Sequence, residues 1–158
     1  MEIGSLAEWF SAVGTIGAVI ISLYLANKKP KRNLLISHKL ENTAKSFAGT
    51  EGVIPTVVVT VTNLEIYPER IERIDFKFDH VRFSLSPGST IGITIGKKLP
   101  YIIKPNSKTK FYFKIEEINN ELNEKNVNVD SSGEVVVLDS MGNKHKDKTK
   151  LVLKNNYK

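Results

Sequence analysis

The stretch VVVTVTN, at residues 57–63, decides the fold class of this chain. Valine occupies the alternate positions Val57, Val59 and Val61, while threonine gathers on the intervening positions. Side chains of a β-strand point to opposite faces with a period of two, so this stretch predicts a strand with one apolar face. Its β-branched residues favour the same conformation, because they pack well on a pleated surface.

The same alternation recurs on both sides of this stretch. In RIDFKF at 73–78, Ile74, Phe76 and Phe78 are expected to point inward, and the intervening residues outward. The other clear strand candidates are 34–40, 111–115, 134–140 and 150–154, and the weaker ones are 81–85, 91–95 and 101–103. About seven to nine short strands separated by Pro, Gly and Asn turns predict an all-β fold, an antiparallel Ig-like β-sandwich over residues 34–158.

One helix interrupts the strands. In IEEINNELNEKN, Ile115, Ile118 and Leu122 recur at helical spacing, which predicts a short helix near 115–125. Its acidic residues are expected to face solvent.

The first part of the chain has a different character. From Trp9 to Ala26 there are 18 residues without a charge, WFSAVGTIGAVIISLYLA. A helix of this length spans about 27 Å, close to the roughly 30 Å of bilayer hydrocarbon. Trp9 and Tyr24 lie near its two ends, where interfacial aromatic residues are found. We therefore predict a transmembrane helix over 1–26 and a basic juxtamembrane linker over 27–33.

Three other interpretations of the apolar stretch were weighed. A cleaved signal peptide has basic residues before its apolar part, whereas here Glu2 and Glu8 precede it and the basic residues follow. A helix lying in the membrane interface needs a charged face, which this one lacks. The core helix of a soluble domain is compatible with the length, and it stays open beside the spanning anchor.

Charge sets the expected orientation. The basic residues Lys28, Lys29, Lys31 and Arg32 all follow the apolar stretch. Because basic flanks remain in the cytoplasm, we expect the N-terminus outside and the C-terminal domain inside, in the cell membrane. These four residues are the predicted contacts with anionic lipid. The net charge of +6 comes from this segment and from the lysines in 144–158, and whether that basic tail also contacts lipid is open.

The residues that carry chemistry are sparse. The chain has no cysteine, which excludes disulfides, thiolate nucleophiles and cysteine-ligated metals. None of the three histidines, His38, His80 and His145, has a metal-ligand partner at helical or loop spacing. A triad of Ser140, His145 and Asp139 is sterically conceivable but disfavoured, because Asp and Ser are common turn residues at a strand end. We predict no catalytic residue, no cofactor and no metal, and the sequence does not indicate an enzyme.

Nucleic-acid binding is also disfavoured. The lysines of the C-terminal tail stand without arginine and with Tyr157 as the one aromatic residue among them. Base recognition favours arginine and stacking aromatic side chains. Alternating lysines on a strand also protect a sheet edge from aggregation.

The anchor, together with VTVTN, IIKPNSKTKFYFKI and VLDSMGNKHK, resembles a loose group of small bacterial membrane proteins. Some of these are prophage-encoded, and most have no assigned function. The resemblance implies one N-terminal transmembrane helix followed by an Ig-like β-sandwich, in a host-membrane or phage-exclusion setting. It carries over no catalytic residue.

Two classes of function stay open at this point. The first is a single-pass membrane protein with a non-catalytic cytoplasmic module for interaction or regulation, acting on a protein partner that the sequence does not identify. The second is an extracytoplasmic adhesion or sensing domain, which requires the inverted topology. An enzyme with an unrecognised site is the third and least favoured alternative.

Small residues gather on one side of the predicted anchor. At 100° per residue, one face holds Ser11, Gly14, Thr15, Ala18 and Ser22. Small residues four apart let two helix backbones approach closely in lipid. We therefore expect a helix-packing face that makes the chain a homo-oligomer or joins it to a partner transmembrane helix.

Gly14→Ile and Ala18→Ile test this face. Each variant fills the groove without lowering hydrophobicity, so association should fall while membrane insertion stays unchanged. A FRET assay between labelled copies in membranes measures association, and Ile16→Leu on the opposite side is the control. An unchanged FRET signal and unchanged partner capture in both variants would mean that the clustering of small residues has no packing role.

Overall fold

The computed structural model describes residues 6–27, 33–47, 50–87 and 97–153, and side chains are not described at 6–8 and 43–51. The chain divides into two compact units, Met1–Lys31 and Arg32–Lys158. The predicted strand at 91–95 lies outside the described residues, as do Lys28, Lys29, Lys31 and Arg32.

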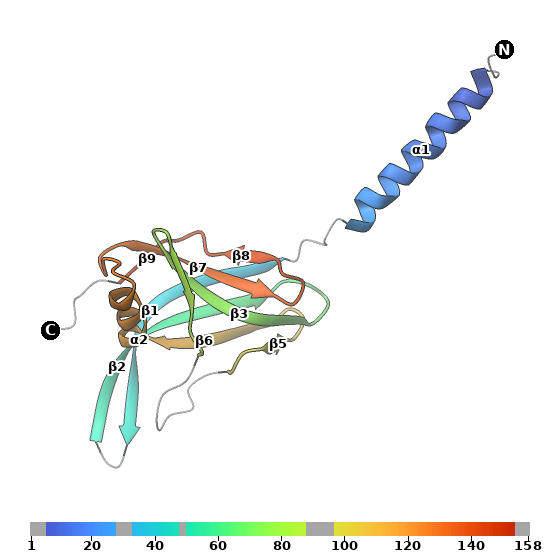
Figure 1. Ribbon diagram of the computed structural model, residues 1–158. Coiled ribbons are helices and arrows are strands. Elements are labelled where there is room, and N and C mark those ends of the chain that lie inside the picture. Colours follow the sequence, from blue (N-terminus) through green and yellow to red (C-terminus); the bar gives the residue numbers. More distant parts are fainter. Residues whose placement is uncertain (1–5, 28–32, 48–49, 88–96, 154–158) are drawn as a thin grey trace. The chain divides into compact units, whose positions relative to one another are not determined.

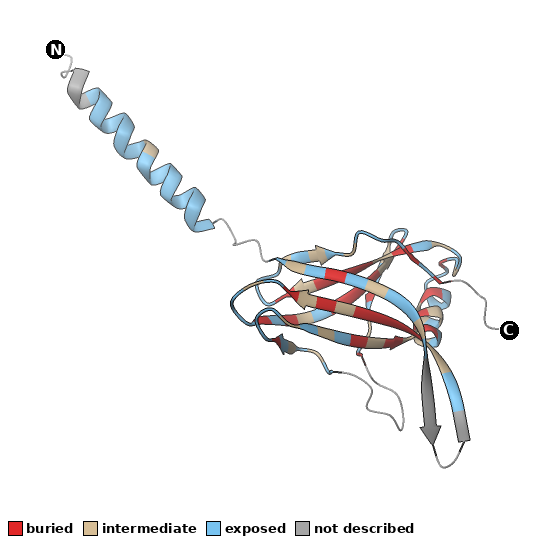
Figure 2. Ribbon diagram, turned by 180° about the vertical axis from the view of Figure 1, so that it is seen from behind, coloured by how far each residue is buried: buried red, intermediate tan, exposed pale blue. Residues whose placement is uncertain are grey.

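The first unit contains helix α1 (Leu6–Asn27). Its segment Trp9–Asn27 has a mean hydropathy of 1.8, and none of it is buried within the chain (Figure 2). Even large apolar side chains such as Phe10 and Ile16 are exposed along it. This helix is long and apolar enough to cross a membrane.

The second unit consists of two antiparallel sheets (Figure 1). The first sheet has the order β1-β2-β6, formed by β1 (Leu34–Phe47), β2 (Thr50–Asn63) and β6 (Lys108–Lys114). The second has the order β4-β3-β7-β8, formed by β3 (Glu69–Phe78), β4 (Val81–Ser84), β7 (Ser132–Asp139) and β8 (Lys144–Lys146). Two short strands extend it, β5 (Tyr101–Ile103) on β3 and β9 (Leu151–Val152) on β7.

The core lies between the apolar faces of these sheets. Val57, Val59 and Val61 of β2 belong to the same buried cluster as Ile74 of β3. Aromatic side chains join the two layers, since the Phe76 and Phe113 rings meet edge to face with centroids 5.0 Å apart. Such a pair contributes about 0.5–1.5 kcal/mol beyond the burial of its area. Alternating apolar positions thus give each sheet one face that only the other sheet buries.

Helix α2 (Ile115–Glu124) packs against the same core. Ile118 and Leu122 are fully buried, while Glu116 on the other side of the helix is exposed. The predicted helix near 115–125 is therefore confirmed, and it begins at Ile115, the residue that had been expected to end a strand.

The described residues confirm a mostly β fold with two antiparallel sheets after an N-terminal helix. The first predicted strand, 34–40, is too short, because β1 pairs with β2 from Leu34 opposite Asn63 to Phe47 opposite Thr50. Strand β8 was not predicted, because its sequence KHK has no apolar residue to show a period. The closer assignment to an Ig-like topology stays a prediction.

Asp75 differs from the expectation of a solvated side chain. It points away from the core, yet it is only 2% exposed. Arg82 Nε donates to Asp75 Oδ2 over 2.7 Å, and Arg73 Nε lies 3.0 Å from Asp75 Oδ1. The two arginine side chains cover the carboxylate and supply its counter-charge, which allows it to be buried.

Gly133 of β7 offers a test of the packing. A Cβ atom there would lie 2.5 Å from Cε1 of the fully buried Phe78, its partner across the sheet. Gly133→Ala should therefore lower the free energy of unfolding by about 1–3 kcal/mol, as measured by urea denaturation of the full chain in detergent.

Ser132→Ala is the matched control, because Ser132 is the exposed neighbour in the same strand. In a Phe78→Leu background, Gly133→Ala should cost less, since the smaller side chain makes room. An equal cost in both backgrounds would show that the Phe78 ring is not the obstacle.

Candidate functional site at the linker end of the sandwich

One end of the sandwich gathers three connecting segments beside the point where the chain enters the domain. We call it the linker end. Here β1 begins, β2 ends, β3 begins and β7 ends, as the antiparallel registers require. The connecting segments are 64–68 between β2 and β3, 104–107 between β5 and β6, and 140–143 between β7 and β8. Figure 1 shows the three segments at the same end of the sandwich.

Asn63 holds two of these segments together. Its side chain is completely buried, and Nδ2 donates to the carbonyl oxygens of Tyr67 at 2.7 Å and of Ile103 and Lys104 at 3.3 Å. Oδ1 accepts the backbone N–H of Glu65 at 2.9 Å. An asparagine side chain has two donor hydrogens and one acceptor oxygen, so this network uses all of its hydrogen-bonding groups.

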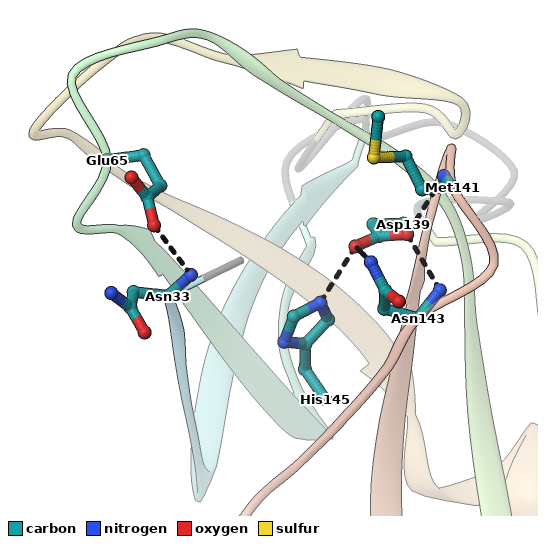
Figure 3. A network of polar contacts seen from close by, with 6 residues as sticks. All are labelled: Asn33, Glu65, Asp139, Met141, Asn143 and His145. Carbon is teal, nitrogen blue, oxygen red and sulfur yellow. Dashed lines mark hydrogen bonds and ion pairs between the residues drawn. The ribbon is translucent and has the colours of Figure 1, made fainter. Parts of the chain in front are cut away.

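Asn33 attaches the beginning of the domain to the same segment. Its backbone N–H donates to Oε1 of Glu65 over 3.0 Å, a contact drawn in Figure 3. Its carbonyl oxygen accepts the backbone N–H of Leu64 at 3.1 Å. The last residue of the predicted linker is therefore hydrogen-bonded directly to the segment 64–68.

This segment exposes an unusual amount of apolar surface. Leu64, Ile66 and Tyr67 are 54%, 70% and 61% exposed, and we call these three residues the apolar tip. From the sequence alone, this segment counts only as one of the Pro, Gly and Asn turns between strands. The signal that could have revealed the tip is the sequence LEIYP, since turns are usually made of small polar residues.

A basic groove lies next to the tip. It has a volume of about 420 Å³ and follows the edge strands β5 and β6, and none of the described residues that line it is acidic. Its lysines are Lys97, Lys104, Lys108 and Lys110. Tyr101, Ile102 and Tyr112 supply apolar surface between them. Such a lining suits an anionic ligand with an apolar part.

Asp139 organises the segment between β7 and β8 (Figure 3). Its Oδ1 accepts the backbone N–H groups of Met141 at 2.9 Å and Asn143 at 2.8 Å. Its Oδ2 faces Nδ2 of Asn143 at 2.9 Å and Nε2 of His145 at 3.0 Å. Burial raises the pKa of Asp139, but the hydrogen bonds from His145, the Asn143 side chain and the two backbone N–H groups outweigh it, and the pKa lies below its ordinary value.

Only two of the three residues of the conceivable triad are in contact. Asp139 and His145 are in contact, whereas Ser140 is exposed and donates its backbone N–H to the carbonyl of Arg70 at 3.0 Å. Among the described residues, no hydrogen bond joins the Ser140 hydroxyl to His145. The four hydrogen bonds that Asp139 accepts give it a turn-stabilising role.

A second histidine–carboxylate contact was missed by sequence reasoning. Nδ1 of His38 in β1 lies 2.6 Å from Oδ2 of Asp147, just after β8, and both side chains are less than a tenth exposed. The two residues are 109 positions apart, so no local pattern could pair them. Their contact connects the two sheets along one edge. In the part of the chain that the structure describes, no three or more acidic or histidine side chains form a metal site.

The predicted helix-packing residues of α1 are all exposed, and the Thr15 hydroxyl donates to the Ser11 carbonyl of its own helix at 2.9 Å. An added Cβ at Gly14 would meet nothing within 4 Å. Of the C-terminal lysines, Lys144 lies at the linker end, opposite Leu138, and Lys146 pairs with Glu134 at 3.0 Å. Lys154 and Lys158 lie outside the described residues.

Comparison with known proteins adds no assignment. No protein-family model matches the chain, and no curated protein matches its sequence. Function therefore has to be argued from the helix, the sandwich and the linker end.

Asp139 predicts an acid-sensitive contribution to stability. Because its pKa is lower in the folded chain, this contribution is complete above the ordinary aspartate value of about 3.9 and is lost as the pH falls through the folded pKa. Asp139→Asn should cost about 1–3 kcal/mol of unfolding free energy at pH 7, and its difference from the parent chain should shrink below about pH 4.

Urea denaturation of the full chain in detergent between pH 7 and pH 2 measures this difference. Asp130→Asn, at an exposed aspartate, is the control and should follow the parent chain. A cost for Asp139→Asn that is equal at both pH values would contradict an ionised carboxylate as the anchor of the turn.

Proposed function

We propose that this chain is a single-pass membrane protein that presents a non-catalytic β-sandwich on the cytoplasmic side, as a module for interaction or regulation. The observation that carries the proposal is the contrast between the two units. The sandwich gathers a core of buried apolar residues, whereas the large apolar side chains of α1 are exposed from Trp9 to Leu25.

Transfer into lipid accounts for this contrast. Near the centre of a membrane helix, each Leu, Ile, Val or Phe favours insertion by about 0.3–0.6 kcal/mol. In water the same side chains would form an apolar surface far larger than soluble monomers usually expose. A membrane-anchored module gains function from its location, because tethering raises the effective concentration of its surface near membrane partners.

The cytoplasmic orientation rests on the basic residues Lys28, Lys29, Lys31 and Arg32, which follow the helix in the sequence. The alternative is an extracytoplasmic adhesion or sensing domain. A signal sequence also meets the criteria of length and apolarity that α1 meets. The phage-exclusion setting implied by the resemblance stays a prediction, and so does an Ig-like topology.

Single cysteines distinguish these topologies, because the parent chain has none. Ser132→Cys places a thiol at an exposed position of the sandwich, and Ser5→Cys places one before α1. On intact cells, a membrane-impermeant maleimide should label Ser5→Cys and leave Ser132→Cys unlabelled until the cells are lysed.

Labelling of Ser132→Cys on intact cells, with Ser5→Cys protected, would instead establish the extracytoplasmic alternative. The molecular mass of the membrane-extracted chain is the accompanying control. Loss of the α1 segment from it would identify a signal sequence and contradict the anchor.

A further inference from the structure

We infer that the linker end of the sandwich is a lipid-docking face, in which the apolar tip and the lysines Lys104 and Lys108 contact an anionic membrane leaflet. The inference rests on the proposed function, because it requires that α1 holds the chain at a bilayer. Beyond the proposed anchor and the basic linker, a surface of the folded domain itself then contacts anionic lipid.

The apolar tip is held outward. Asn63 fixes Glu65 and Tyr67 through their backbones, and Asn33 fixes Leu64. With the backbone of the segment bound on both sides, the side chains of Leu64, Ile66 and Tyr67 stay exposed instead of folding onto the domain. Leucine and isoleucine favour the acyl-chain boundary, and tyrosine favours the headgroup level, so the tip has the composition of an interfacial contact.

Positive charge lies directly beside the tip. The Nδ2 atom of Asn63 that binds the carbonyl of Tyr67 also binds that of Lys104, so the tip and the rim of the basic groove are joined through one side chain. Lys104 and Lys108 are exposed, and within the described ranges neither forms an ion pair. The acid of the tip segment, Glu65, is turned back onto Asn33.

The opposite end of the sandwich has the opposite charge. The range 115–131, which holds α2, has one base, Lys125, and more acids: Glu116, Glu117, Glu121, Glu124 and Asp130. Lys125 pairs with Glu121 at 3.1 Å and Lys114 with Glu117 at 3.5 Å, so the range keeps an excess of negative charge. An anionic surface attracts the linker end and repels this far end, so the charge distribution orients the domain with its tip toward lipid.

Chain length favours a lipid occupant over a protein. Five residues lie between Asn27, the last residue of α1, and Asn33, so the Cα atoms of these two residues can be at most about 20 Å apart when the chain is fully extended. Asn33 is hydrogen-bonded to the tip segment, so the tip cannot leave the neighbourhood of the membrane that holds α1. A surface that is tethered near a bilayer needs only weak contacts to stay docked on it.

The experiment uses the full chain in vesicles. Trp9 is the one tryptophan, so Trp9→Phe gives a silent background in which Ile66→Trp reports on the tip. In phosphatidylglycerol vesicles, the introduced indole should show blue-shifted emission and quenching by lipids brominated near the headgroup end of their acyl chains. Val53→Trp is the matched control, because Val53 is as exposed as Ile66 and lies on β2 far from the linker end; its indole should stay unquenched.

Charge variants test the lysines. Lys104→Ser with Lys108→Ser should lower the ratio of docked to free domain about 30-fold, since each lysine near an anionic surface contributes roughly five-fold. The control removes the same charge elsewhere, with Lys148→Ser and Lys150→Ser, and should leave docking unchanged. Phosphatidylcholine vesicles should give weaker quenching than phosphatidylglycerol vesicles.

Three results would overturn the inference: equal quenching of Ile66→Trp and Val53→Trp, no effect of removing Lys104 and Lys108, or equal quenching on neutral and anionic vesicles. If the tip binds a protein and not lipid, the first of these results is expected in vesicles that contain only lipid.

Soluble glycerol phosphate has the charge of the headgroup without its acyl chains. A blue shift caused by it would assign the groove to a small anion and would also overturn the inference.

A second measurement distinguishes a failure of the proposed membrane anchor from a failure of the docking inference. Quenching of native Trp9 in the parent chain, with resistance of the chain to alkaline carbonate extraction, reports insertion of α1. An inserted α1 with an unquenched tip overturns only the docking inference, whereas a chain that carbonate extracts overturns the proposed function as well.

Discussion

Asn63 is the residue on which the arrangement of the linker end depends. Its amide nitrogen binds the carbonyl oxygen of Tyr67 in the segment 64–68 and those of Ile103 and Lys104, where β5 passes into the segment 104–107. Its amide oxygen accepts the backbone N–H of Glu65. Leaving any of these buried backbone groups without a hydrogen-bond partner would cost free energy of folding. One buried side chain therefore satisfies several groups at once and sets the position of the apolar tip relative to the basic groove. The position of Asn33 follows from the same network through Glu65 and Leu64.

The body of the sandwich depends on a different constraint, the mutual burial of two apolar sheet faces. Phe76 and Phe113 meet across the layers, and α2 covers part of the core with Ile118 and Leu122. At one edge, the contact of His38 with Asp147 connects β1 to the chain after β8. These features make the domain an independent unit with charge of opposite sign at its two ends.

Periodicity predicted those elements whose cause is local. The strands around 57–63 and 73–78 and the helix near 115–125 were found because their apolar residues repeat with the period of the element. Strand β8 and the full length of β1 were not predicted, because pairing with a neighbouring strand, and not their own composition, makes them strands. Asp75 was expected in solvent for a similar reason. Its burial needs Arg82, which lies on the neighbouring strand β4 opposite Lys77 and reaches Asp75 diagonally, and a strand pattern contains no sign of that partner.

The sequence by itself determined the apolar helix, the strand pattern with one buried face, the absence of cysteine chemistry and the basic segment after the apolar helix. Each of these depends on the identity or the spacing of residues that are close together in the chain. Only the tertiary structure decided that Asn63 joins Tyr67 to Lys104, that His38 meets Asp147, and that Leu64, Ile66 and Tyr67 remain outside the core. Contacts of this kind form between residues that are distant in sequence, and their energy depends on the packing of the whole domain. A local pattern therefore does not record the contacts of Asn63 with Lys104 or of His38 with Asp147, and only the sequence LEIYP pointed to the exposed tip.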